Sequence, residues 1–328
     1  MSSIKVALLG FGTVGSGVYE LINHEQKRLR ELIGRPVQIV AVLINDERKQ
    51  RDIDQDILVT SNIDDVLAQE VDVVVEAIVG VEPAYTYLTK AIHQGCHVVT
   101  ANKEMFAYKG FELRKQANEQ RVEVYYEAAV AGAIPIISTL RDVFKVNRVA
   151  RLEAILNGTT NYILTEMREN GTSLEAALKT AQAQGYAESD PTNDVEGYDA
   201  LYKLVILSEL LLGKQVNCTT VEREGIKEVN LESIKRASKR NHRIKHVAKL
   251  AFEGDKLQLY IRPLEVDEDH PLFAVEGVDN AVVVTGNYVG QLKFEGPGAG
   301  KFPTASVMVD DLVDIMQQDQ RAVSPVVR

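Results

Sequence analysis

The segment 185–204, GYAESDPTNDVEGYDALYKL, concentrates groups that can bind a cation or move a proton. It contains one lysine, Lys203, and five carboxylates: Glu188, Asp190, Asp194, Glu196 and Asp199. A solvated acidic loop, a metal site and a pocket for a cationic substrate are all compatible with this composition. A calcium loop places Asp or Asn two residues after its first aspartate, where this chain has Thr192, so chelation by the segment is disfavoured.

The second half of this segment predicts a largely buried helix. Residues 196–212 carry leucine, isoleucine or valine around much of the helical circumference and end at Gly213. Glu196, Asp199 and Lys203 follow i, i+3, i+7 spacing and are expected to share one face. Because unpaired charge on a buried helix is costly, we expect this face to line a polar pocket.

A second lysine stands where ligands of parallel sheets bind. Lys103 follows the apolar segment 97–101, HVVTA, and so lies just past the carboxyl end of a predicted strand. Hydride transfer is the chemistry of the nicotinamide dinucleotides that the glycine turn described next would bind. Reduction of a carbonyl by such a cofactor needs a proton donor, and oxidation of an alcohol needs a base. Neither cysteine stands in an activating motif, so the two candidates for proton transfer are Lys103 and Lys203.

A glycine turn near the N-terminus predicts a dinucleotide site. GFGTVG follows the apolar segment 4–9 and opens a helix, which is the context that gives a GxGxxG pattern its meaning. A pyrophosphate would lie at the N-terminus of that helix. The predicted cofactor contacts are Gly10, Phe11, Gly12, Thr13, Val14, Gly15, Arg48, Lys49, Thr100, Asn102, Lys103 and Gly300.

The end of the second predicted strand is expected to bind the adenosine ribose. It continues as INDERKQR, residues 44–51. Asp46 or Glu47 would accept from the 2′-hydroxyl of NAD, whereas Arg48 and Lys49 would hold the 2′-phosphate of NADP. We favour NADP, and the sequence leaves NAD open.

The arrangement of elements indicates an α/β fold with a Rossmann-type doubly wound parallel sheet. Apolar segments 4–9, 37–44, 71–79, 97–101 and 122–130 alternate with predicted helices 13–34, 83–94 and 109–119. Beyond residue 131 the pattern becomes α+β. It has strands at 151–157, 246–254, 256–266, 280–287 and 290–296 and helices at 160–168, 173–184, 196–212 and 231–240. We expect a dinucleotide-binding domain, 1–130, joined by a returning C-terminal helix within 303–328, and a second domain, 131–302.

Bulk properties exclude several functions. The 328 residues allow two domains. The net charge of −10 disfavours nucleic acid and anionic membranes as partners. Two cysteines, Cys96 and Cys218, give no disulfide framework and fit a reducing, cytoplasmic location. No signal peptide and no apolar run long enough to span a membrane are expected.

Six motifs together resemble the homoserine dehydrogenase family. They are GFGTVG, VVTANKE (98–104), YEAAVAGAIPII (126–137), ILNGTTNYI (155–163), GYAESDPTNDVEGYDALYK (185–203) and GPGAGKFPTAS (296–306). The resemblance implies NAD(P)-dependent interconversion of L-homoserine and L-aspartate 4-semialdehyde, in threonine, methionine and isoleucine biosynthesis. It also implies a homodimer, with 131–302 serving substrate binding and dimerisation.

The resemblance also assigns roles by position. Lys103 and Lys203 match the lysines of proton transfer and hydroxyl positioning. Glu188 matches the carboxylate that binds the substrate amino group, Asp194 and Asp199 complete the pocket, and Tyr186 and Thr159 line it. A monovalent cation, usually sodium, would be held by Glu127 and the backbone carbonyls of Val130, Gly132 and Ile134.

The charges expected around the two lysines give them roles that agree with those implied by the resemblance. Carboxylates beside Lys203 keep it charged, which suits it to binding a hydroxyl or polarising an aldehyde oxygen. Lys103 has only Glu104 beside it, so we predict Lys103 as the acid/base, with a pKa lowered by burial. Asp190 and Glu196 are expected to be loop and helix-start residues.

Two departures from the family pattern are visible. Ala133 stands where many members have glycine, and we expect the extra methyl group to be tolerated. The chain ends at Arg328, so we expect no regulatory domain and weak threonine inhibition.

The rival interpretations are another Rossmann dehydrogenase, acting on an amino-acid aldehyde or hydroxy acid, and a dinucleotide-binding redox sensor, which the absence of a basic patch disfavours.

Overall fold

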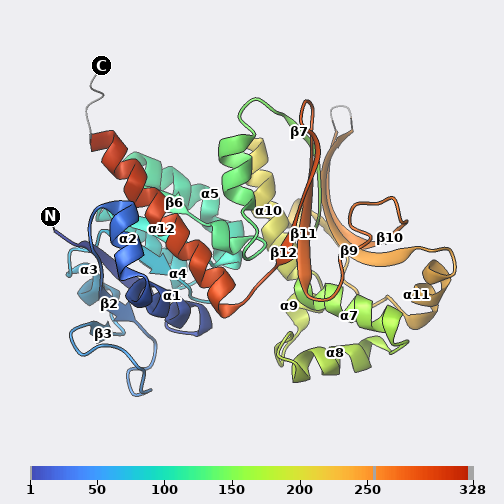
Figure 1. The fold of residues 1–328 in the computed structure, drawn as a ribbon, viewed down its shortest axis with the longest axis horizontal. Helices are drawn as coiled ribbons and strands as arrows, with labels where there is room; N and C mark the ends of the chain where they lie inside the picture. The colour runs from blue at the N-terminus through green and yellow to red at the C-terminus, as the bar shows by residue number, and fades with distance from the viewer. Residues whose placement is uncertain (1, 254–255, 324–328) are drawn as a thin grey trace. The chain divides into compact units, whose positions relative to one another are not determined.

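The computed structural model describes residues 2–253 and 256–323 (Figure 1). The chain divides into two compact units. The first unit is Met1–Ala129 with Gly300–Arg328, and the second is Val130–Ala299.

The first unit is built on a six-stranded parallel sheet with the order β3-β2-β1-β4-β5-β6. Continuous apolar strands are expected when both faces of a parallel sheet are covered. The strand order reverses between β1 and β4, as in Rossmann folds, and this confirms the predicted fold class. The strands are β1 Ile4–Leu9, β2 Val37–Leu43, β3 Leu58–Thr60, β4 Val73–Glu76, β5 His97–Thr100 and β6 Val124–Tyr125.

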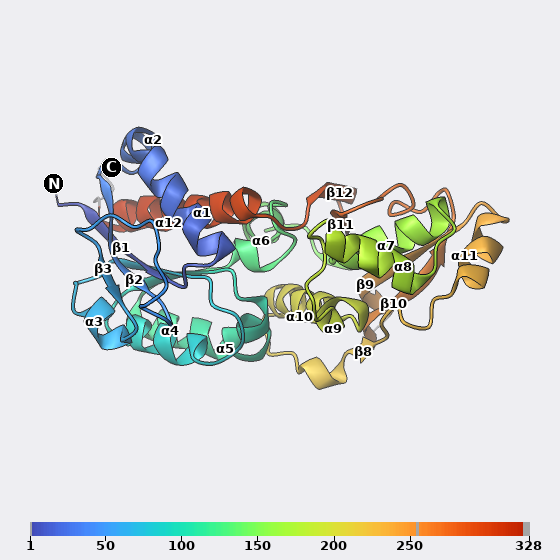
Figure 2. The same cartoon turned by 90° about the horizontal axis from the view of Figure 1, so that it is seen from below.

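The helices of this unit are α1 Thr13–His24, α2 Gln26–Ile33, α3 Ile63–Leu67, α4 Ala84–His93, α5 Lys103–Gln120 and α12 Lys301–Val323, with a 3₁₀ turn, η1, at Glu127–Ala129. α12 runs beside α1 and α2 (Figures 1 and 2). Its Met308, Leu312 and Ile315 are buried in the same core as β1. Residues at opposite ends of the sequence therefore share one hydrophobic core.

Several predicted boundaries in this unit are corrected. The single helix predicted at 13–34 is two helices, because the chain leaves helical geometry at Glu25. The helix predicted at 109–119 begins earlier, at Lys103, because the Asn102 side chain caps its N-terminus. The strand predicted at 122–130 is confined to Val124–Tyr125. β3 and α3 are too short to leave a periodic signal and were not predicted.

The second unit has a six-stranded sheet with the order β12-β11-β7-β9-β10-β8. Its pairs are antiparallel, as predicted for an α+β domain, except that the short β8 runs parallel to β10. The strands are β7 Val149–Ile155, β8 Glu222–Arg223, β9 Arg243–Glu253, β10 Lys256–Val266, β11 Asp279–Gly286 and β12 Gly290–Pro297. The helices are α6 Ile136–Ser138, α7 Gly158–Glu169, α8 Leu174–Ala183, α9 Thr192–Val195, α10 Tyr198–Leu212 and α11 Leu231–Ser238, with single turns η2 Thr139–Val143 and η3 Cys218–Thr220.

The helix predicted at 196–212 begins two residues later, and this changes the role of Glu196. Gly197 has a φ of 81°, a left-handed conformation that separates α9 from α10. Glu196 is the C-terminal capping residue of α9 and pairs with Lys227 at 2.5 Å, which lowers the pKa of its carboxyl. The prediction that Glu196 starts the long helix and shares a face with Asp199 and Lys203 is therefore wrong.

Among the helices of residues 2–253 and 256–323, every one is too short or too polar to cross a bilayer.

Candidate active site

The glycine turn leaves the start of α1 open to an anion. Gly10 has a φ of 95°, and a Cβ there would stand 2.9 Å from the carbonyl oxygen of Ala77. A Cβ on Gly15 would overlap the carbonyl oxygen of Gly10, whereas Gly12 faces open space. No side chain caps the helix at Gly12. Free N–H groups and open space fit a dinucleotide pyrophosphate, so the residues present suit this cofactor.

Gly15→Ala and Gly12→Ala should separate the structural and the binding roles of this turn. Gly15→Ala should lower the free energy of unfolding by about 1–3 kcal/mol or more, because its methyl group meets fixed backbone. Gly12→Ala should cost at most about 1 kcal/mol without cofactor. It should nevertheless raise the Kd for NADPH roughly tenfold or more by filling the space of the pyrophosphate. Urea unfolding and fluorescence titration measure the two effects, and equal losses of stability in both variants would contradict the assignment.

The segment after β2 contains both the acidic and the basic side chains that could contact the adenosine ribose of the cofactor. Asp46 accepts from the backbone N–H and the Nε of Arg48, and these bonds lower the pKa of Asp46. Glu47 accepts from the backbone N–H of Ser61 at 2.7 Å. The Arg48 side chain is 92% exposed, so it can turn toward a 2′-phosphate.

At the end of β5, a hydrogen-bonded cap places Lys103 at the first position of α5. The Oδ1 of Asn102 accepts from the backbone N–H of Met105 at 3.0 Å. Met105 and Phe106 then turn into the core, while Lys103 is exposed. The expectation that Lys103 is buried is therefore wrong, since it occupies the outer side of the first helical turn.

In the second unit, a buried ion pair anchors the predicted substrate site. The Nζ of Lys203 donates to Oδ2 of Asp199 and to the carbonyl oxygen of Leu156, each at 2.7 Å. The side chains of Lys203 and Asp199 are 8% and 3% exposed. The pairing of these two residues on a buried helix is thus confirmed, and the ammonium group is held in one place.

Asn157 joins this pair to a third acid and was missed by the sequence analysis. Its Nδ2 donates to Asp199 at 2.9 Å and to Asp194 at 2.7 Å, while its Oδ1 accepts from the backbone N–H of Thr160. Its position before α7 in LNGTT is the signal of a helix cap. The sequence has no signal for the contacts with the two aspartates.

The loop before α9 holds Tyr186, Glu188 and Asp190, and Thr159 of α7 bonds to it. The hydroxyl of Thr159 donates to the carbonyl oxygen of Tyr186 at 2.7 Å. The Tyr186 ring lies 5.1 Å from that of Tyr162 and is 44% exposed. Glu188 is exposed on this loop, outside the hydrogen-bonded group around Lys203. Asp190 accepts from the N–H and hydroxyl of Thr192, which confirms it as a loop residue.

The residues predicted to hold a cation contain a left-handed turn. Ala131 and Gly132 have φ values of 55° and 58°. The next residue, Ala133, donates its N–H to the carbonyl oxygen of Pro297 and does not have a positive φ, so its methyl group does not stand at a left-handed position. Glu127 is 5% exposed. Carboxylate and backbone carbonyl oxygens are the donor types that hard cations prefer. Clusters of three or more His, Cys, Asp or Glu side chains with metal-binding geometry do not occur in the described part of the chain.

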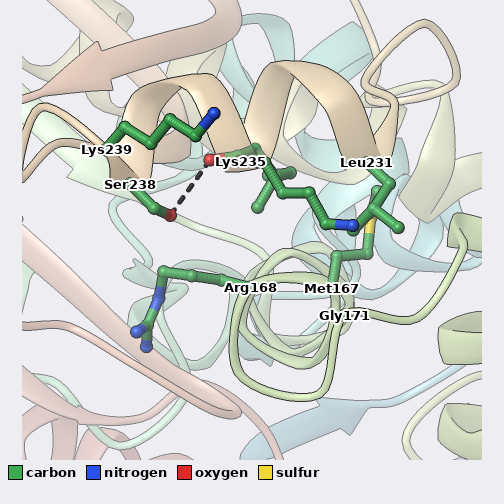
Figure 3. Close-up of a pocket in the computed structure, with 8 residues that line it drawn as sticks. Met167, Arg168, Gly171, Leu231, Lys235, Ser238 and Lys239 are labelled. Atoms are coloured by element: carbon green, nitrogen blue, oxygen red, sulfur yellow. Dashed lines mark hydrogen bonds between the residues drawn. The ribbon is translucent and has the colours of Figure 1, made fainter.

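A separate hollow of about 400 Å³ lies between α7 and α11 of the second unit (Figure 3). Met167 points toward Leu231 of α11, whereas the guanidinium of Arg168 points away from that helix, and the Ser238 hydroxyl donates to the carbonyl oxygen of Ile234. Arg168 is already paired with Glu169 and Glu276. None of the predicted site residues lines this hollow, so we assign it no part in the chemistry.

The profile of a family described as homoserine dehydrogenase matches residues 135–313, and that of its NAD-binding domain matches residues 10–127. The chain belongs to the homoserine dehydrogenase family. Members of this family are NAD(P)-dependent oxidoreductases.

Individual members resemble this chain over nearly its whole length. Homoserine dehydrogenase of Bacillus subtilis is 42% identical over 319 residues, which are 97% of this chain and 74% of that protein. The homoserine dehydrogenase of Lactococcus lactis is 37% identical over 324 residues, which are 97% of this chain and 75% of that protein.

Solved structures of the family share the fold. A homoserine dehydrogenase from Thiobacillus denitrificans superposes with a TM-score of 0.93 at 39% identity, covering 99% of this chain and 76% of that one. A hyperthermophilic archaeal homoserine dehydrogenase, in complex with NADPH, gives a TM-score of 0.82 at 27% identity and covers both chains fully.

Proposed function

We propose that this homoserine dehydrogenase family member interconverts L-homoserine and L-aspartate 4-semialdehyde with NAD(P). The observation that carries the proposal is the hydrogen-bonded group of buried Lys203, Asp199 and Asn157 with half-buried Asp194, which combines a fixed ammonium donor with acids able to face a zwitterionic substrate. The open glycine turn supports the cofactor.

Bound NAD(P) would supply or accept the hydride. The protein's own residues provide the rest. Lys203 donates a hydrogen bond to the substrate oxygen, and Asp199 fixes its position. Asn157 holds Asp194 and Asp199 in one orientation, so that Asp194, with Glu188, meets the substrate ammonium group. Lys103 moves the proton to or from the reacting oxygen.

A spectrophotometric assay of nicotinamide reduction tests the proposal. L-Homoserine should be oxidised with NAD or NADP, and other amino-acid alcohols and hydroxy acids should react far more slowly. A different preferred substrate would favour the other-dehydrogenase interpretation. Tight nicotinamide binding without turnover of any substrate would favour the redox sensor.

We propose NADP as the preferred cofactor, supported by the exposed Arg48 at the end of β2. Arg48→Ala should raise the KM for NADPH roughly tenfold, because one charge-assisted phosphate contact is worth about 1.5–3 kcal/mol. The KM for NADH should change less than twofold. Arg28→Ala, at an exposed arginine of α2, is the control. A wild-type chain that strongly prefers NADH would overturn the proposed preference.

We further propose a homodimer formed through 131–302, a bound monovalent cation, probed with sodium, and a cytoplasmic role in threonine, methionine and isoleucine synthesis. The buried carboxylate of Glu127, an oxygen donor of the kind hard cations prefer, supports the cation, and family membership supports the biosynthetic role. Light scattering tests the dimer, and activity in sodium against choline salts tests the cation.

A further inference from the structure

One buried carboxylate of the first unit has no part in the mechanism above. Glu76 is the last residue of β4 and is 0% exposed. In the sheet it lies opposite Leu9 at the end of β1 and opposite Thr100 at the end of β5. β1 and β4 flank the point where the strand order reverses, which is where ligands of such sheets bind. A buried acid at this place needs an explanation.

Three donors converge on the Glu76 carboxylate. The hydroxyl of Thr100 donates to Oε2 at 2.5 Å, and the backbone N–H of Ile78 donates to Oε1 at 2.5 Å. The amide of Asn102 points to Oε1 at a longer 3.4 Å. Because all three partners donate, the arrangement is satisfied by an ionised carboxylate. A protonated Glu76 would bring a fourth hydrogen into the group and force a donor to turn away.

The same donors fix the start of α5. The Thr100 hydroxyl oxygen accepts from the backbone N–H of Asn102 at 3.0 Å. The Asn102 side chain caps α5 through Met105 and donates to the carbonyl oxygen of Gly80 at 2.8 Å. Lys103 is the next residue after Asn102. The orientation of the first turn of α5 is therefore tied to Glu76 through two buried side chains.

We propose that Glu76 is a positioning residue whose ionised carboxylate, acting through Thr100 and Asn102, holds Lys103 in place for proton transfer. This inference rests on the proposed function, in which Lys103 moves the proton.

Glu76 is also able to titrate near neutral pH. Burial raises its pKa to about 7, although the hydrogen bonds from Thr100, Ile78 and Asn102 lower it. The folded chain thus binds this proton more tightly than the unfolded chain. The stability that protonation of Glu76 contributes to the folded chain is therefore lost as the pH rises from about 4.5 to about 7. Positioning of Lys103 follows the opposite direction, because it depends on the ionised form.

Other ionisable groups around Glu76 are few. The segment 77–80 that follows it has none. The ionisable groups of β1 and β5 stand at the far ends of those strands. On α4, which packs on β4, the lysine and histidine are exposed and the two tyrosines are half-buried. The groups nearest in sequence to Thr100 and Asn102 are in the first turn of α5. These groups are Lys5 on β1, His97 on β5, Tyr85, Tyr87, Lys90 and His93 on α4, and Lys103 and Glu104 on α5.

The test uses reduction of L-aspartate 4-semialdehyde by NADPH, in which Lys103 acts as an acid and contributes only an alkaline limb. The wild-type profile of kcat against pH should then show an acid limb near pH 7 from Glu76. Glu76→Gln should lose this limb and have a kcat reduced roughly 10- to 100-fold at pH 8, since small misplacements of a catalytic group are costly. Thr100→Val should reproduce the loss of the limb, and Thr100→Ser should restore it.

A stability measurement separates folding from positioning. Between pH 5 and pH 8 the wild-type chain should lose unfolding free energy relative to Glu76→Gln. If Glu76→Gln does not fold, Thr100→Val and Thr100→Ser decide the test by their acid limbs. An active wild type whose profile is unchanged in Glu76→Gln overturns the inference alone. A wild type inactive on both homoserine and the aldehyde overturns the proposed function, and the inference with it.

Discussion

Replacing Lys103 by alanine should lower kcat by about 10²- to 10⁴-fold, the usual contribution of a positioned acid or base. The fold should be unaffected. Lys103 is exposed at the first turn of α5, where truncation changes stability by no more than about 0.5 kcal/mol. Steady-state kinetics with L-homoserine and NADP, alongside thermal unfolding, measure both quantities.

A second lysine of the same helix provides the control for Lys103. Lys109 is 41% exposed and pairs with Glu112 at 3.5 Å. Lys109→Ala removes the same charge from α5, so a general electrostatic effect on cofactor binding would appear in both variants. Lys109→Ala should keep kcat within about twofold of the wild type. Near-normal turnover in Lys103→Ala would show that another group moves the proton.

Removing Asp199 should destabilise the second unit and abolish turnover. Asp199→Leu leaves the buried ammonium of Lys203 without its carboxylate, which costs about 3–5 kcal/mol in comparable buried pairs. Lys203→Met should cost a similar amount, because it leaves Asp199 charged and buried. The Asp199→Leu, Lys203→Met double variant should recover much of the loss, since no buried charge remains unpaired. It should stay inactive.

Urea unfolding of the four proteins in this cycle gives the coupling energy. The exposed pair Lys109–Glu112 is the reference, and its coupling should not exceed about 0.5 kcal/mol. A coupling equally small for Asp199 and Lys203 would mean that water solvates the pair. The separation of stability from activity in the double variant is the informative result, because it distinguishes a catalytic lysine from a structural one.

Local sequence determined the architecture of the first unit. The apolar strands and the glycine turn predicted a parallel sheet because a strand covered on both faces leaves an uninterrupted apolar pattern. The requirement for glycine at 15 is equally local, since a Cβ there meets the carbonyl oxygen of Gly10, whereas at Gly10 it is the backbone of Ala77, just after β4, that excludes a Cβ. The i,i+4 pair of Asp199 and Lys203 was also readable, because helical spacing alone brings them together.

Only the tertiary structure decided which side chains complete the site. Asn157 meets Asp194 and Asp199 across 37 and 42 residues, and Glu76 meets Thr100 across 24. Such contacts depend on the register of strands and on the packing of α7 against α9 and of β4 beside β5, which no sequence period encodes. Lys103 is exposed because α5 begins at this residue, after the Asn102 cap, and α9 and α10 are separate helices because Gly197 is left-handed. Helical periodicity predicts neither feature. The sequence thus specified the elements and the types of chemical group, and packing between distant segments specified which groups act together.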